Sequence, residues 1–325
     1  MLRHFWGSLS VFAIALVSAF YFWGWQGVYI VALLGLLEVS LSFDNAVVNA
    51  KVLGAMDPVW QTRFIFWGIP IAVFGMRFLL PVLLVAAVTD MSVAQTFGYA
   101  LNDPEKYAHA LHSGEALIHA FGGAFLLMVA LGFYFDDDRK IHWIKAIENN
   151  RFTRGAARID TIELMLATAV GIVLLWQTAD AAVGIAFFAG MLLYEAISKI
   201  DALLSSDTAR NGAAGFVYLE ILDASFSLDG VVGAFALSTN IYIIMLGLGV
   251  GALFVRSLTI FLVKKGTLAE YRYLEHGAHY AIFALAGIML TKIFFEVSEA
   301  ITGSIGAAFI LIAFWHSVWA NRKKI

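Results

Sequence analysis

Two short stretches of the sequence place carboxylates and serines among apolar residues. The first runs from Glu38 to Asn45 and the second from Asp223 to Gly230, and both read acid, apolar, Ser, apolar, Ser, apolar, Asp, then Asn or Gly. The offset between them is 185 residues at every position. Carboxylate, hydroxyl and amide oxygens bind hard cations such as Mn²⁺, Mg²⁺ and Ca²⁺. The pattern therefore predicts a divalent-cation site built from two copies of one motif.

The candidate ligands are carboxylates, one amide and two hydroxyls. Glu220, one helical turn before Asp223, has no acidic counterpart in the first motif and is either a further ligand or a proton carrier. The alternative to a metal site is that the acids form buried ion pairs with Arg77, Arg256 and Lys292. The candidate metal residues are Glu38, Ser42, Asp44, Asn45, Glu220, Asp223, Ser227 and Asp229.

The spacing of the polar residues predicts that both motifs depart from a regular helix. At about 100° per residue, Glu38 and Ser42 share one helical face and Asp44 lies on another. An extended stretch places every second residue on one side. Such backbone is tolerated at membrane depth where it lines a cavity, and its freed carbonyls are further oxygen ligands. We expect local unwinding around Ser40–Asn45 and Ser225–Gly230.

Basic residues accompany the motifs at corresponding places. Arg77 and Arg256 lie in the segments that follow each motif. They are candidate counter-ions that hold the empty site together, and snorkelling or hydrogen bonding between helices is the alternative. His119 and His279 each follow a glutamate by four residues and are candidate proton relays or secondary ligands. Ordinary buried histidines near a helix start are the alternative, and Lys292 is expected to snorkel.

The composition places these motifs in a membrane. The chain has 325 residues, of which 61% are hydrophobic and 14% charged, and its mean hydropathy is +0.82. Soluble domains average about 25% charged residues. A net charge of -3 provides no basic surface for nucleic acid, and the absence of cysteine excludes disulfides and thiolate chemistry. The predicted class is an all-α polytopic transmembrane bundle without a permanent cofactor.

About ten segments are long and apolar enough to be membrane spans. The fifth and sixth are the shortest, and a re-entrant pair is the alternative there. The predicted spans are 8–23, 28–51, 62–89, 114–135, 162–178, 181–197, 214–237, 241–263, 276–297 and 301–320.

The distribution of Lys and Arg predicts that both termini are cytoplasmic. With the N-terminus inside, 17 of the 21 basic residues fall in inner segments, and only Lys106 falls in an outer one. The connection at about 136–161 is expected to be a solvated inner loop facing anionic lipid. Residues 90–113 are expected to be an outer loop.

The correspondence between the motifs extends to the neighbouring spans. Arg77 matches Arg256, and the start of the fourth span matches the start of the ninth. Five spans separate the two copies, so they must cross the membrane in opposite directions. This is an inverted-topology repeat, a transporter plan with its site near the midplane. We expect a single transmembrane domain with one repeat at about 1–178 and the other at about 181–320.

The motifs resemble the signatures of the TerC family of integral membrane proteins, named for tellurium resistance. Leu37-Glu38 with Leu41-Ser42-Phe43-Asp44-Asn45 is similar to the first signature, and Asp223 with Ser227-Leu228-Asp229 to the second. A Gly-Val-Val-Gly sequence stands where many members have serine and proline, so the chain resembles a divergent branch. Members of that family and its superfamily are implicated in exporting divalent metals, chiefly Mn²⁺, from the bacterial cytoplasm. The resemblance implies an inner-membrane location and the metal residues Glu38, Asp44, Asn45, Asp223 and Asp229.

The expected function is therefore export of a divalent cation by alternating access rather than an enzymatic reaction. Mn²⁺ is favoured over Ca²⁺ and Mg²⁺, and protons are candidate counter-ions because crowded carboxylates in a low-dielectric site take up protons readily. The alternatives are a cation channel or metal sensor with the same site, an intramembrane hydrolase using paired aspartates, and a haem carrier using His119, His279 or His316. A homo-oligomer is compatible with the pattern but not indicated by it.

Overall fold

The computed structural model describes residues 5–322, apart from gaps at 90, 137–138, 160, 204–211, 236, 239 and 266–270. Within the described residues the regular secondary structure is entirely helical, as the sequence predicts. The helices are α1 (Trp6–Leu41), α2 (Phe43–Ala55), α3 (Pro58–Pro70), η2 (Ile71–Leu79), α4 (Leu80–Val88), α5 (Val93–Asn102), α6 (Pro104–Ser113), α7 (Glu115–Tyr134), α8 (Lys145–Glu148), α9 (Arg151–Ala156), α10 (Ile162–Thr178), α11 (Ala181–Leu203), α13 (Ala213–Phe235), α14 (Ile241–Lys265), α16 (Leu274–Lys292) and α17 (Glu299–Arg322).

Each predicted span coincides with a helix or a run of helices. In the described part of the chain, six helices are long and apolar enough to cross a membrane: α1, the run Pro58–Ala87, α7, α11, α14 and α17. Helix α10 is apolar but has 17 residues, and α13 carries three acids along its length. The chain is therefore a helical membrane protein, while the number of ten crossings and the inverted repeat stay predictions.

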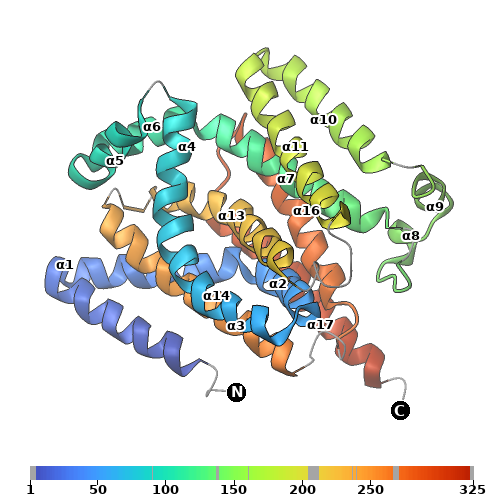
Figure 1. The fold of residues 1–325 in the computed structure, drawn as a ribbon, viewed down its shortest axis with the longest axis horizontal. Helices are drawn as coiled ribbons and strands as arrows, with labels where there is room; N and C mark the ends of the chain where they lie inside the picture. Colours follow the sequence, from blue (N-terminus) through green and yellow to red (C-terminus); the bar gives the residue numbers. More distant parts are fainter. Residues whose placement is uncertain are drawn as a thin grey trace.

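Helix α1 bends back on itself at Gly24, so that it supplies the first predicted span and the first part of the second, which α2 completes (Figure 1). Gly24 has φ of 64° and ψ of -157°, a conformation that residues with a Cβ rarely adopt. Tyr21, Phe22 and Trp25 around the bend are exposed, as expected for aromatic side chains at a membrane interface.

The predicted unwinding of the first motif is confined to one residue, and that of the second is wrong. Ser42 separates α1 from α2 with φ of -104° and ψ of 16°. The backbone hydrogen bonds from Ser42 to Glu38 and from Ala46 to Ser42 are nevertheless kept, at 2.9 and 3.2 Å. Helix α13 runs without interruption through Ser225–Gly230. A continuous helix satisfies its own backbone groups where no water can, so an unwound stretch needs partners that a helix does not.

The third predicted span has an irregularity that the sequence analysis missed. Pro70 closes α3, and the chain continues as the π-helix η2 before α4 begins. Proline lacks the N–H that a helix needs at that point, and π-helical turns are frequent at functional sites. Arg77 lies in this widened segment and donates from Nη1 to the Ala72 carbonyl at 3.0 Å.

The two predicted repeats are interleaved. The most extensive helix pairs, α1 with α14, α7 with α11 and α7 with α16, each join an element of the first repeat to one of the second. Glycines on α14 allow the close approach to α1: a Cβ on Gly247 would lie 2.5 Å from that of Leu34, and one on Gly251 2.5 Å from that of Glu38. Small residues at such crossings bring helix backbones together in membranes, and here they hold Glu38 against α14.

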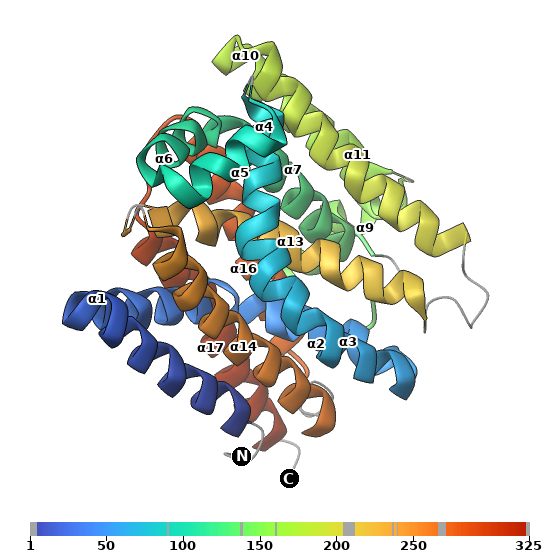
Figure 2. The ribbon, with the colours of Figure 1, turned by 60° about the vertical axis from the view of Figure 1, so that its left-hand side comes forward.

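The start of α1 and the end of α17 lie at the same end of the molecule (Figure 2). Helices α5 and α6 and the turn between α10 and α11 lie toward the opposite end. Which of these two ends is cytoplasmic stays a prediction from the distribution of Lys and Arg. The region 90–113, expected as a loop, consists mainly of α5 and α6.

The connection 136–161, which was expected to be a solvated inner loop, is not a simple solvated loop. It contains α8 and α9, and Glu148 within it is 3% exposed. Glu148 accepts a hydrogen bond from the Trp143 amide at 2.9 Å and contacts His276 Nδ1 of α16 at 3.2 Å. Trp143 Nε1 lies 2.6 Å from His316 Nδ1 of α17. The connection is thereby fastened to two helices of the bundle.

Candidate functional site

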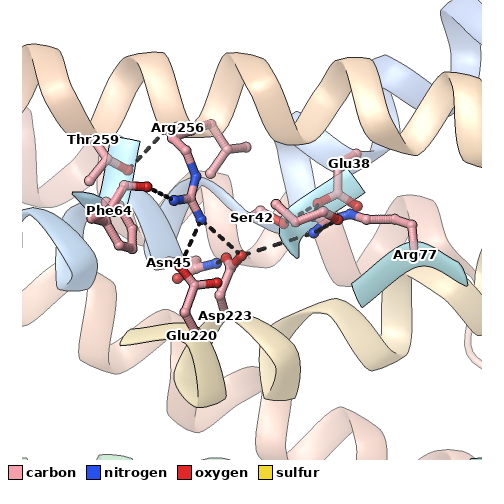
Figure 3. Close-up of polar contacts among 11 residues, drawn as sticks. Glu38, Ser42, Asn45, Phe64, Arg77, Glu220, Asp223, Arg256 and Thr259 are labelled. Atoms are coloured by element: carbon pink, nitrogen blue, oxygen red, sulfur yellow. Dashed lines mark hydrogen bonds and ion pairs between the residues drawn. The ribbon is translucent and has the colours of Figure 1, made fainter. Parts of the chain in front are cut away.

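Glu38 and Arg77 form a buried ion pair between α1 and η2 (Figure 3). Their exposed fractions are 1% and 2%. The Ser42 hydroxyl, one turn along from Glu38, donates to Glu38 Oε1 at 2.9 Å. The first acid of the first motif is therefore paired with its predicted counter-ion and a serine of the same motif.

Asp223 lies between the two arginines. Its Oδ2 is 3.7 Å from Arg256 Nη2 and 4.0 Å from Arg77 Nη1, and its Oδ1 accepts a hydrogen bond from the side-chain amide of Asn45. One carboxylate on α13 thus contacts side chains from α2, η2 and α14 (Figure 3). The structure brings both motifs into one network. The first acid of each motif lies next to the arginine of the same predicted repeat: Glu38 next to Arg77, and Asp223 next to Arg256.

Arg256 reaches this network past the backbone of α3. Its Nη1 donates to the Phe64 carbonyl at 2.6 Å, and its guanidinium lies 4.0 Å from the centroid of the Phe64 ring. A Cβ on Gly68 would lie only 1.4 Å from Arg256 Nη1. Any side chain at position 68 would therefore displace the guanidinium. The sequence analysis did not single out Gly68, because an isolated glycine in an apolar helix does not indicate what lies against it.

Glu220 belongs to the same network. Its Oε1 is 3.5 Å from Arg256 Nη2, and its exposed fraction is 7%. Among the described residues its two carboxylate oxygens accept no hydrogen bond. A buried carboxylate with free lone pairs can bind a further cation or a proton, and both roles stay predictions for Glu220.

Asp44 and Asn49 flank this network on α2. Asp44 is buried in the first turn, where a carboxylate interacts favourably with the helix dipole, and accepts the Asn45 backbone N–H at 2.9 Å. Asn49 is 3% exposed, and its Oδ1 has no hydrogen-bond partner within the described residues. The sequence analysis missed Asn49, although its position one turn after Asn45 in an apolar helix is a usable signal.

A small cavity of 10 Å³ lies between the two arginines. A volume of this size holds about one water molecule or an ion of similar size. Its polar lining includes the carboxylate of Asp223, both guanidinium groups and Asn49. The lining residues are Asn49, Phe64, Arg77, Asp223, Ala252, Val255, Arg256 and Thr259.

The network does not form a ready metal cage. Among the described side chains, no three His, Asp or Glu are arranged to hold an ion. Glu38, Glu220 and Asp223 instead face guanidinium groups, which is the ion-pair alternative considered from the sequence. The side chains of 225–229 lie outside the described residues, so Ser227 and Asp229 are located only by the helix that carries them.

The two candidate histidines lie on α7 and α16. His119 is fully buried, and its Nδ1 is 4.0 Å from a carboxylate oxygen of Glu115. His279 Nδ1 is 2.9 Å from the Glu275 carbonyl, and its ring stacks on Phe133 with the centroids 3.7 Å apart. These contacts for His279 are those of a packed core residue, and the relay role of both stays a prediction.

A larger cavity of 1060 Å³ lies beside the first motif. Leu37, Ser40 and Leu41 of α1 form one wall, and Glu115 and Lys292 contribute charged groups. Glu38, Arg77 and Asp223 are not among its lining residues, so this cavity is separate from the buried network.

The fold and the site define a helical membrane protein with a buried network of acids and arginines. The chain belongs to the family described as "Protein of unknown function (DUF475)", whose model matches residues 43–324. The match includes the second motif, Arg77 and Arg256, and begins after Glu38. No curated protein and no solved structure matches the chain.

Proposed function

We propose that this protein carries a divalent cation, with Mn²⁺ favoured, out of the bacterial cytoplasm by alternating access. One observation carries the proposal: acids and an amide from both motifs meet in a single buried network, through Glu38, Asn45 and Asp223. Charged groups at membrane depth are costly and are functional candidates by default. Ion pairing alone explains how these groups are neutralised. It does not explain why the same motif occurs twice in the sequence, with the acids of both copies close together in the structure.

The pairing pattern supports an inverted repeat. Glu38 with Arg77 in the first copy corresponds to Asp223 with Arg256 in the second, and each pair joins adjacent predicted spans. Helix α1 packs on α14, and α13 packs on η2, which is the reciprocal arrangement expected of two related halves. The shared acid contacts lie between the halves, as expected for a carrier with its site at the repeat interface.

Burial of the network favours a carrier over a channel. Glu38, Asp44 and Asp223 are each at most 6% exposed, so an ion at these residues is closed off from both sides in this conformation. A carrier with an occluded site saturates at modest rates, whereas a channel needs a continuous open path.

The test is metal flux in proteoliposomes. The purified protein is reconstituted, and uptake of Mn²⁺, Ca²⁺, Mg²⁺ and Zn²⁺ is measured with and without a pH gradient. We expect saturable Mn²⁺ flux that is abolished by Asp44→Asn and by Asp229→Asn. Asp57→Asn, at an exposed position between α2 and α3, serves as the matched control and should transport normally. Unchanged flux in both motif variants would refute the proposal.

A further inference from the structure

We infer that Arg77 and Arg256 are tethered cations that occupy the metal site between transport cycles, so that the empty carrier returns without a counter-ion. This inference rests on the proposed function and specifies how its return step is balanced. It assigns the two arginines a role in turnover rather than in fold stability alone.

A carrier built on buried carboxylates must neutralise them after the metal has left. Two guanidinium groups carry the same total charge as one divalent cation, and they are paired with the first acid of each motif, Glu38 with Arg77 and Asp223 with Arg256. Reorienting uncompensated carboxylates through a low-dielectric interior is strongly unfavourable. Protons, a second metal ion or a cation supplied by the protein can neutralise them, and the structure contains the third of these.

The guanidinium groups already occupy the positions that a substrate cation would be expected to take. Arg77 pairs with Glu38 and lies 4.0 Å from Asp223, while Arg256 lies 3.7 Å from Asp223 and 3.5 Å from Glu220. The two charges converge on one carboxylate from opposite repeats. They border the one-water cavity, which is the space next to Asp223 that an incoming ion would enter.

Each guanidinium also has a second partner that does not depend on a carboxylate. Arg77 donates to the Ala72 carbonyl at 3.0 Å, and Arg256 donates to the Phe64 carbonyl at 2.6 Å and stacks on the Phe64 ring. A metal ion can therefore displace the arginines from the acids without leaving the guanidinium groups unsolvated. The long, flexible side chains need only small movements to alternate between the two sets of partners.

Metal-for-metal exchange and net efflux should differ in whether they need the arginines. In metal-for-metal exchange the carrier is loaded on both legs, so the arginines are not needed for neutralisation. In net efflux the carrier returns empty, and the arginines are needed. Loss of one guanidinium should therefore reduce net efflux while exchange persists.

The experiment measures both fluxes of radioactive Mn²⁺ in the same proteoliposomes, with the membrane potential clamped and the pH equal on both sides. The wild-type protein should give net efflux without accompanying proton uptake. Arg77→Gln and Arg256→Gln should each lower net efflux at least about tenfold more than they lower exchange, because only the empty form has uncompensated carboxylates. Acidifying the side from which the empty carrier returns should restore net efflux, since protons then replace the missing charge.

Arg63→Gln removes an exposed arginine of α3 and is the matched control, with both fluxes expected to be normal. The inference is overturned if wild-type net efflux requires proton uptake, if the folded variants lose both fluxes alike, or if they keep normal net efflux. Proton uptake during net efflux by the wild-type protein tests the inference even where a variant does not fold. An absence of all Mn²⁺ flux from the wild-type protein would instead refute the proposed function.

Discussion

Removing either partner of the Glu38–Arg77 pair should destabilise the protein strongly, and removing both should cost less free energy of unfolding than the sum of the two single losses. Glu38→Gln leaves the guanidinium without its carboxylate, and Arg77→Gln leaves the carboxylate without its guanidinium. Both side chains are at most 2% exposed, so water does not replace the lost partner. The double variant contains two neutral amides that can hydrogen-bond to each other.

The geometry sets the size of each effect. Removing one partner of a buried ion pair costs about 3–5 kcal/mol. Arg77 is also 4.0 Å from Asp223, where the Coulomb attraction is about 4 kcal/mol at an effective dielectric constant of 20 before desolvation is subtracted. We therefore expect Arg77→Gln to lie at the upper end of the range and Glu38→Gln at the lower end. The double variant should be more stable than the sum of the single effects by about 2 kcal/mol.

The assay is the free energy of unfolding in detergent, measured by denaturant titration and tryptophan fluorescence for all four forms of the protein. Lys51 and Glu275 form a control pair that joins α2 to α16, but Lys51 is 58% exposed. Their coupling energy should be below about 1 kcal/mol because the pair is screened by solvent. Additivity at Glu38 and Arg77 within about 0.5 kcal/mol would refute the buried network as a source of stability.

Three further substitutions test other parts of the structure. Gly68→Ala should displace the guanidinium of Arg256, lowering the melting temperature and the net efflux of Mn²⁺, because the new Cβ would lie 1.4 Å from Nη1. Asn45→Asp replaces the amide donor to Asp223 with a like charge and should cost at least about 2 kcal/mol in unfolding free energy, since a buried hydrogen bond becomes a repulsion. Burial raises the pKa of Glu148, but the neighbouring His276, Trp143 amide and Arg139 outweigh it and hold that pKa below its usual value. The stabilisation from Glu148 should thus be complete above the pKa of an unfolded glutamate and disappear as pH falls through the lower folded value. Proteolysis of the connection 136–161 should therefore become faster at acidic pH in the wild type. In Glu148→Gln it should already be fast at neutral pH.

Each of these substitutions has a control within the chain. Gly98→Ala adds a Cβ with nothing within 4 Å, and Asn102→Asp changes an exposed amide near the end of α5. Glu105→Gln changes an exposed acid on α6 and should leave proteolysis of the connection 136–161 unaffected at any pH. Normal melting of Gly68→Ala, normal stability of Asn45→Asp, or equal proteolysis of the wild type and Glu148→Gln would contradict the respective contact.

The helices were predictable because long apolar segments of the sequence indicate membrane spans. The turn at Gly24, the limits of α7 and the separation of α10 from α11 all follow changes from apolar to polar or flexible residues. The region 90–113 was predicted less well. Its helices are short and mixed in polarity, and the hydropathy pattern that marks a span is absent there.

The candidate site was predictable in its members but not in its pairing. The repeated motifs identified Glu38, Asn45 and Asp223, and the structure brings these together. The distance between a carboxylate and a guanidinium on different helices depends on helix rotation and crossing, which no local pattern encodes. For the same reason the sequence did not show that Gly68 makes room for Arg256.

The π-helix and the continuous α13 illustrate the same limit. A proline predicts a disturbed helix, but whether the helix kinks or forms a π-helical turn there depends on the neighbouring helices. In α13 the alternating polar pattern suggested unwinding, but the backbone stays helical, and polar side chains around a helix can be satisfied by separate neighbours.

The most direct test of a cation site shared by the two motifs is calorimetric titration of the purified protein with Mn²⁺. A single Mn²⁺ should bind per chain, and the site should be lost in Asp44→Asn and equally in Asp229→Asn, because each copy supplies part of one cage. Binding that is unaffected by both substitutions, or that depends on one motif alone, would contradict the account.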